Sequence, residues 1–268
     1  MVFNPTHAFL TTENCKLHYW YLGSGPLFIF IPGGGGHGSQ YNAIMTHLSS
    51  SYTCCTFDRR GMSSSVLLPN QTSSSDSQPT TLIFSPPQQA RDIAAIINTL
   101  SLTLFSDSRA PKATIFASSL GGLLGFQLAI DHPHLITHLI CHEASSPMLL
   151  PDSSEHRSYI RILSGGRDDA PASPPVENLM KFFENEFLIA STYNPDWRKI
   201  VRNGVNVVVL AGEKSEEEDS WLAKGTVEQQ QVLGCERWVV PGHHAGFEVE
   251  AEKFALALKE VIERLEEM

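Results

Sequence analysis

A serine stands in a run of small residues that could present a nucleophile. Ser119 lies between a strand-length apolar run, residues 113–117, and a helical pattern over residues 120–130. Ala117 and Gly121, two positions before and after it, are small enough to let the chain turn sharply and expose the hydroxyl. The helix that follows would direct free N–H groups and its positive dipole end at an oxyanion formed there. The pattern predicts a nucleophile elbow, although a plain strand–turn–helix connection would use the same residue types.

Two adjacent histidines near the end of the chain could supply the base that such a serine needs. A serine hydroxyl is almost entirely protonated at neutral pH, so it attacks only when a neighbouring group takes its proton. Histidine side chains suit this role because they exchange a proton near neutral pH. His243 and His244 follow a Pro-Gly pair between the last predicted strand, residues 237–240, and the last predicted helix, residues 250–265. Both could also be ordinary loop histidines.

Short β-type runs alternate with helical patterns along most of the chain. This alternation predicts an α/β fold with a mainly parallel sheet and helices on both faces. The other predicted strands cover residues 15–22, 27–31, 52–57, 136–141 and 205–211, and a further helix covers residues 88–100. A chain of 268 residues is long enough to bury a large core without disulfides or metal ions.

The elbow, the histidine loop and the alternating pattern together resemble the α/β-hydrolase superfamily over nearly the whole chain. The chain is most similar to cofactor-free serine hydrolases in which the acid follows the strand after the elbow helix, zearalenone-type lactonases among them. The resemblance implies a single α/β-hydrolase domain over residues 1–268 and a reaction without a cofactor. It also places the base at His244, where the family's Pro-Gly-x-His spacing matches, and leaves His243 to packing or solvent.

The resemblance offers two places for the carboxylate that orients the catalytic histidine. The first is Glu143, which follows the strand at residues 136–141 in a His-Glu pair before a Pro-containing turn. A charge at the end of a buried strand is costly unless it is paired or solvated. Relatives with this arrangement use the glutamate as the triad acid, so we predict Glu143 for that role.

The second place follows the strand at residues 205–211. Many relatives carry Asp at the position where this chain has Ser215. Glu213 and Glu216 lie nearby and are the alternative acids. However, the acids from Ser215 onward also fit a capping box at the start of a helix that runs through Trp221.

A glycine run at residues 33–38 follows the predicted strand at residues 27–31. Glycines let the backbone approach a substrate closely and leave its N–H groups accessible. In the hydrolase interpretation, the N–H groups of Gly34 and Leu120 form the oxyanion hole.

The same glycine run also supports a rival interpretation, an NAD(P)-binding Rossmann protein. The dinucleotide-binding spacing G-x-G-x-x-G occurs at Gly33, Gly35 and Gly38, and Asp58 lies 20 residues after the last of them. Two features count against it: a whole strand precedes the unit, and Pro32 separates the strand from the glycines. The rival also leaves Ser119 and His244 without a role.

The segment from about residue 145 to residue 197, the lid segment, interrupts the regular alternation. It contains Pro-containing turns and helical pieces but no strong strand. We expect it to form a helical lid over one end of the sheet, not a second domain, and to hold the apolar part of a substrate. The predicted substrate-binding residues are Met148, Leu149, Phe183 and Phe187.

Composition limits the classes of partner. Nineteen Lys and Arg against 29 Asp and Glu give a net charge of −10, and no basic stripe is present to bind nucleic acid. No apolar run approaches the roughly 20 residues of a membrane helix, and residues 1–14 lack the pattern of a secretory signal. Four histidines between residues 132 and 142 lack a carboxylate or thiol at a suitable spacing, so no metal site is expected. We expect a cytoplasmic protein that acts on a small molecule, and a homodimer is compatible with these features.

Together these features predict a serine hydrolase that cleaves a carboxylic ester or lactone of a small, largely apolar molecule through an acyl-enzyme. A catalytically silent α/β-hydrolase-fold protein that binds a small molecule is the alternative.

Overall fold

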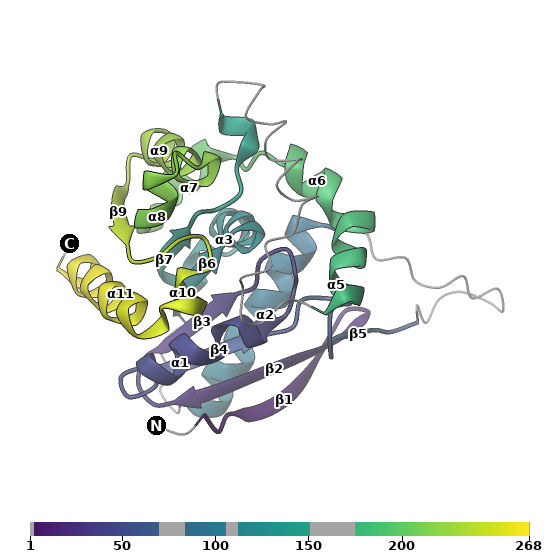
Figure 1. Cartoon of the computed structure of the whole chain (residues 1–268). Coiled ribbons are helices and arrows are strands. Elements are labelled where there is room, and N and C mark those ends of the chain that lie inside the picture. Colours follow the sequence, from purple (N-terminus) through teal and green to yellow (C-terminus); the bar gives the residue numbers. More distant parts are fainter. Residues whose placement is uncertain (1–2, 70–83, 106–111, 151–174, 268) are drawn as a thin grey trace.

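Nine strands form one sheet in the computed structural model, which describes residues 3–69, 84–105, 112–150 and 175–267 (Figure 1). The strands are β1 (Thr6–Thr12), β2 (Cys15–Gly23), β3 (Leu27–Ile31), β4 (Thr53–Phe57), β5 (Val66–Leu67), β6 (Ala113–Ser118), β7 (Ile136–His142), β8 (Val207–Gly212) and β9 (Glu236–Val240). They are ordered β1-β2-β4-β3-β6-β7-β8-β9, and β5 pairs with β2. Neighbouring strands in the series β4-β3-β6-β7-β8-β9 pair in parallel. Strand β2 pairs antiparallel with β1, β4 and β5. The mainly parallel sheet expected from the sequence is confirmed.

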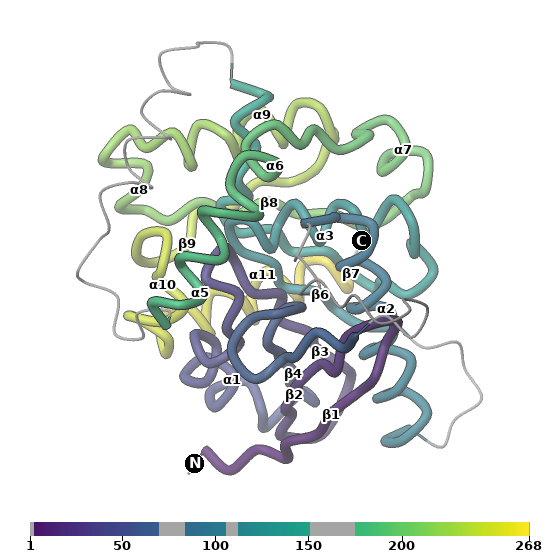
Figure 2. Tube along the Cα trace, turned by 90° about the vertical axis from the view of Figure 1, so that its right-hand side faces the viewer, coloured from purple at the N-terminus to yellow at the C-terminus, as the bar shows by residue number. Residues whose placement is uncertain are grey.

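Helices cover both faces of this sheet. They are η1 (Gly38–Tyr41), α1 (Asn42–Leu48), α2 (Pro86–Leu104), α3 (Leu120–Asp131), η2 (Pro133–Leu135), η3 (Pro147–Leu149), α5 (Val176–Lys181), η4 (Phe182–Glu186), α6 (Phe187–Thr192), α7 (Trp197–Arg202), α8 (Glu213–Glu217), α9 (Trp221–Leu233), α10 (Gly246–Val249) and α11 (Ala251–Glu266). Helices α1 and α11 lie on one face of the sheet and α2 and α3 on the other (Figures 1 and 2), and their buried side chains belong to two separate core clusters. Every residue of β3, β4, β6 and β8 is buried, because these strands are covered on both sides.

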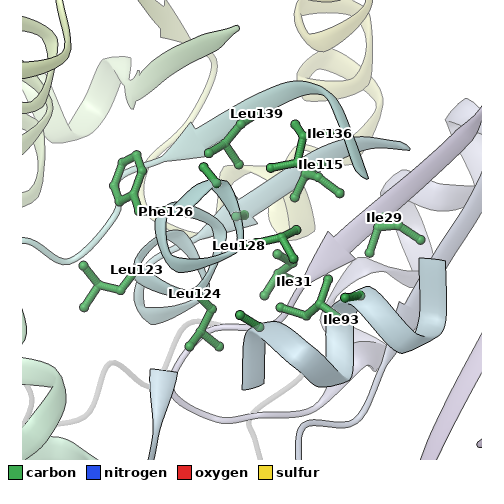
Figure 3. Packing of buried hydrophobic residues seen from close by; sticks show 14 of the residues in the cluster. Ile29, Ile31, Ile93, Ile115, Leu123, Leu124, Phe126, Leu128, Ile136 and Leu139 are labelled. Carbon is green, nitrogen blue, oxygen red and sulfur yellow. The ribbon is translucent and has the colours of Figure 1, made fainter. Parts of the chain in front are cut away.

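The α2–α3 face contains the larger core. Leu124 and Leu128 of α3 belong to one buried cluster with Ile93 of α2 and the strand residues Ile31 and Ile115 (Figure 3). Burial of each such side chain contributes about 1.5–3 kcal/mol. The result is a rigid base under the turn that joins β6 to α3.

Two local predictions were incomplete. The edge strand β1 was not predicted, because it carries three consecutive apolar residues, Ala8 to Leu10, in place of a clear alternation. The helix expected to run from Ser215 through Trp221 is two helices, α8 and α9, separated by a turn in which Asp219 has a φ of 53°. Ser215 is buried within α8, and the side chain of Ser220 caps α9 by accepting from the N–H of Leu222.

The described part of the lid segment is helical, as expected. It includes η3 and the consecutive elements α5, η4 and α6, which form a nearly continuous rod along one side of the molecule (green in Figure 1). Residues 151–174 of the predicted lid segment lie outside the described residues.

Candidate active site

Ser119 occupies the sharp turn between β6 and α3. Its backbone has φ 57° and ψ −128°, a conformation that costs about 1–3 kcal/mol for a residue other than glycine. Space around the turn is tight: a Cβ atom on Gly121 would lie 2.3 Å from the carbonyl oxygen of Ile31, and one on Gly122 would lie 2.2 Å from Cβ of Ala144. Small residues are therefore needed here, and the strained turn places the serine at the carboxyl end of β6.

His244 and Glu143 come from loops after different strands and meet in a hydrogen bond. Glu143 directly follows β7 and His244 follows β9. Nδ1 of His244 lies 2.8 Å from Oε2 of Glu143, and the N–H of Gly212 donates to Oε1 at 2.9 Å. A proton on Nδ1 satisfies the carboxylate and leaves Nε2 free to accept a proton, which is the tautomer that a general base requires.

The Glu143 carboxylate is fully buried, whereas the His244 side chain is 33% exposed. Burial alone would raise the pKa of the Glu143 carboxyl. The hydrogen bond from His244, the charges of His142 and His244 and the N–H of Gly212 outweigh that effect and lower the pKa to about 2. Glu143 is therefore ionised at neutral pH and can stabilise a positively charged His244.

Ser119 and His244 line the same pocket, which has a volume of about 180 Å³. Part of the glycine loop (residues 33–38) forms one wall. Besides Ser119 and His244, the lining residues are Gly33, Gly34, Gly35, His37, Gln40, Ser118, Ala245, Phe247 and Glu248. A larger pocket, of about 300 Å³, lies at the amino ends of β8 and β9. The smaller pocket is the candidate active site, because it holds both the predicted nucleophile, Ser119, and the predicted base, His244.

The two predicted oxyanion donors lie on elements next to Ser119. Leu120 is the first residue of α3, where a backbone N–H has no acceptor within the helix. Gly34 lines the pocket, and a Cβ atom on the preceding Gly33 would lie 3.2 Å from Cβ of Ser119. The glycine loop therefore runs directly beside the nucleophile.

The alternative acids lie in a different environment. Glu213 and Glu216 are exposed on α8, and Glu216 forms an ion pair with Arg237. Within the described part of the chain, the carboxylate that contacts His244 is that of Glu143. His243 lies beside this contact and accepts a hydrogen bond at Nδ1 from the N–H of Ala245, at 3.1 Å.

The four predicted substrate-binding residues lie outside the pocket. Met148 and Phe183 are 47% and 42% exposed, and Leu149 and Phe187 pack against the larger core. None of them lines the pocket among the described residues. A neighbour, Phe182, reaches the glycine loop instead: its ring would lie 3.1 Å from a Cβ atom on Gly34.

Asp58, the acid of the rival dinucleotide motif, makes its contacts within the protein. Its carboxylate accepts hydrogen bonds from the N–H groups of Gly38, at 3.1 Å, and Ser64, at 3.2 Å. It also lies 2.9 Å from Nδ1 of His18. The contact with Gly38 holds the end of the glycine loop in place.

Two groups at the site were not predicted. The Ser145 hydroxyl lies 3.3 Å from that of Ser119. The backbone N–H of Ser145 donates to the Ser119 carbonyl at 3.1 Å. The guanidinium of Arg59 is buried against the glycine loop, with Nε donating to the Gly33 carbonyl at 3.0 Å.

In the described ranges, no group of three or more His, Cys, Asp or Glu side chains is arranged to hold a metal ion. No helix in these ranges is both long and apolar enough to cross a membrane.

Comparison with known proteins places these features in a family. Residues 26–175 match the model of the alpha/beta hydrolase fold. The uncharacterized hydrolase YraK of Bacillus subtilis (strain 168) is 25% identical over an alignment of 285 positions, which covers 95% of this chain and 95% of that protein.

Solved structures share the fold at lower identity. A bromoperoxidase from Bacillus anthracis superposes with a TM-score of 0.68 at 14% identity, covering 97% of this chain and 100% of that chain. A proline iminopeptidase from Mycobacterium smegmatis gives a TM-score of 0.64 at 15% identity, covering 97% and 98%. These similarities cover 97% of the chain. The two proteins have different activities, so the similarities indicate the fold alone.

Proposed function

The chain belongs to the alpha/beta hydrolase fold family, and we propose that it is a serine hydrolase that cleaves a carboxylic ester or lactone of a small, largely apolar molecule. The observation that carries the proposal is the hydrogen bond between the buried Glu143 and His244, because His244 lines the same pocket as Ser119. This arrangement supplies a nucleophile, a base in the correct tautomer and a charge that stabilises the protonated base.

In the proposed reaction, Oγ of Ser119 attacks the carbonyl carbon while Nε2 of His244 takes the hydroxyl proton. The oxyanion accepts hydrogen bonds from the N–H groups of Gly34 and Leu120. The bond to the leaving alkoxide then breaks, and His244 returns the proton to that oxygen. For a lactone, the new hydroxyl stays attached to the acyl group.

Water completes the cycle. His244 takes a proton from a water molecule, the resulting hydroxide attacks the acyl-enzyme, and Ser119 leaves with the proton returned by His244. These steps use only side chains and backbone groups of the chain. We further propose that Met148, Leu149, Phe183 and Phe187 of the lid segment, which lie outside the pocket, hold an apolar part of the substrate that extends beyond it.

Labelling with a fluorophosphonate probe tests the nucleophile. Ser119 would bond to phosphorus as fluoride leaves, so the wild type should be labelled and Ser119→Ala should not. Ser50→Ala, which changes an exposed serine, is the matched control and should be labelled like the wild type. Hydrolysis of model esters and lactones should fall by several orders of magnitude in Ser119→Ala alone. Equal labelling of Ser119→Ala and wild type would refute the assignment.

A further inference from the structure

A fully buried ion pair lies against the glycine loop. Oxygen atoms of Glu186, in the lid segment, lie 2.9 Å from Nη1 and 2.7 Å from Nη2 of Arg59, and both side chains are 0% exposed. Taking two charges out of water is costly unless they are paired and their remaining donors are satisfied. The remaining Arg59 donors are directed at the glycine loop and at Gln89.

Each of the four carbonyl groups from Gly33 to Gly36 accepts a hydrogen bond from Arg59 or from the lid segment. Nε of Arg59 donates to the carbonyl of Gly33 at 3.0 Å, and Nη2 donates to that of Gly34 at 3.1 Å. The side-chain amide of Asn178, also in the lid segment, donates to the carbonyl of Gly35 at 2.8 Å. The main-chain N–H of Arg59 donates to the carbonyl of Gly36 at 2.8 Å.

Fixing a carbonyl also fixes the N–H on the other side of the same peptide bond. A peptide unit is planar and trans, so the carbonyl of one residue and the N–H of the next point in opposite directions. The carbonyl of Gly33 faces Arg59, and therefore the N–H of Gly34 faces away from Arg59. The Gly33 carbonyl also accepts from the N–H of Gly36 at 3.0 Å, but that donor belongs to the same glycine loop. A run of glycines has unusual backbone freedom, so without the bonds to Arg59 the Gly34 peptide could rotate.

We propose that Arg59 is a positioning residue of the oxyanion hole, which orients the Gly34 peptide and is itself held in place by Glu186 of the lid segment. The inference rests on the proposed serine hydrolase function. It makes the lid segment part of the catalytic apparatus, because a lid residue neutralises the cation that orders the glycine loop. The hydrogen bonds from a positively charged donor also polarise the peptide, which strengthens its N–H as a donor.

Neighbouring Arg60 provides a matched control. It is also buried and forms a two-point ion pair, with Nε and Nη2 2.9 Å and 2.6 Å from the carboxylate oxygens of Asp92. Its Nη1 donates to the side chain of Asn14 at 2.7 Å. These partners lie outside the glycine loop, so a change at Arg60 disturbs a buried ion pair without releasing the Gly34 peptide.

The test compares Arg59→Lys with Arg60→Lys. Lysine keeps the charge but has a single nitrogen, which cannot reproduce the fork that reaches the Gly33 and Gly34 carbonyls and Glu186 together. Both variants should melt at lower temperature than the wild type. In Arg59→Lys alone, the rate constant for fluorophosphonate labelling and kcat on p-nitrophenyl acetate should fall about 100-fold, as for loss of an oxyanion donor, while KM changes little.

Each outcome has a defined meaning. Equal rate constants for the two folded variants would overturn the positioning role while leaving the serine hydrolase proposal intact. A wild type that is not labelled at Ser119 would overturn both proposals. If Arg59→Lys does not fold, Arg59→Met combined with Glu186→Met removes both buried charges, and the same drop in the labelling rate constant is expected. A labelling rate constant in that double variant equal to wild type would refute the inference.

Discussion

At the carboxyl ends of the neighbouring strands β7 and β8, acidic residues lie in opposite environments. After β7, Glu143 is fully buried, and each of its oxygens accepts a hydrogen bond, one from His244 and one from Gly212. After β8, Glu213 and Glu216 are exposed on a short helix. The last residue of β8, Gly212, contributes the backbone N–H that donates to the Glu143 carboxylate.

The contrast shows what distinguishes a carboxylate that can act on a base from one that stabilises a helix. A buried carboxylate needs partners for both oxygens, so its position is tightly restrained. Gly212 lacks a side chain, which lets the backbone just before His244 pack against it: a Cβ atom on Gly212 would lie 2.6 Å from the carbonyl oxygen of Gly242. An exposed carboxylate at the start of a helix interacts with the helix dipole and solvent, and its geometry is less restrained.

The largest expected effect comes from exchanging the buried acid for its amide. Glu143→Gln should reduce kcat by about three to four orders of magnitude, because the amide no longer stabilises the protonated base or favours the required tautomer. KM should change far less, since the interaction is strongest in the transition state. Steady-state kinetics on a model ester measures both values.

Glu213→Gln is the matched control for this comparison, because it makes the same exchange at the end of β8. Its kcat should stay close to that of the wild type. Thermal melting must first show that both variants are folded. Near-normal turnover of Glu143→Gln, together with an inactive Glu213→Gln, would move the triad acid to β8.

The sequence pattern and the structure agree where the argument depends on local geometry. The sharp turn at Ser119 could be predicted because small residues must flank such a turn, whereas the choice of Glu143 came from the resemblance to relatives with a His-Glu pair after the same strand. The ion pair between Arg59 and Glu186 could not be predicted, because the partners are 127 residues apart and many charged pairs in the sequence were equally available. The sequence also could not show that Phe182, and not its neighbour Phe183, is the aromatic residue that reaches Gly34, because adjacent residues on a helix face different directions.

The buried end of β7 also predicts a pH dependence of the protein's stability. Burial of the His142 imidazole lowers its pKa from the usual 6.5 to about 4. The unfolded chain therefore takes up this proton at a higher pH than the folded protein does, and stability is lost as the pH falls from 6.5 through 4. Between pH 8 and pH 5 the loss from this group is on the order of 2 kcal/mol.

His142→Phe should remove this part of the pH dependence. The ring lies among Phe116, Phe247 and Phe254, at centroid distances of 5.1–6.1 Å, so a phenyl ring suits its surroundings. Urea unfolding at pH 8 and pH 5 should show a smaller loss of stability in the variant than in the wild type. Equal losses in the two proteins would show that His142 is not responsible.

The smallest expected effect lies at the exposed end of β8. Glu216 lies on α8 and pairs with Arg237, so Glu216→Gln loses a partly exposed ion pair. The cost should be about 1 kcal/mol or less, which corresponds to a decrease in Tm of about 3 °C or less, with kcat unchanged. Glu217→Gln is the control: this neighbouring acid is also exposed on the same short helix, and its exchange should leave the Tm close to that of the wild type. A large loss of kcat in folded Glu216→Gln would mean that the end of β8 takes part in catalysis, and the contrast between the two strand ends would then be wrong.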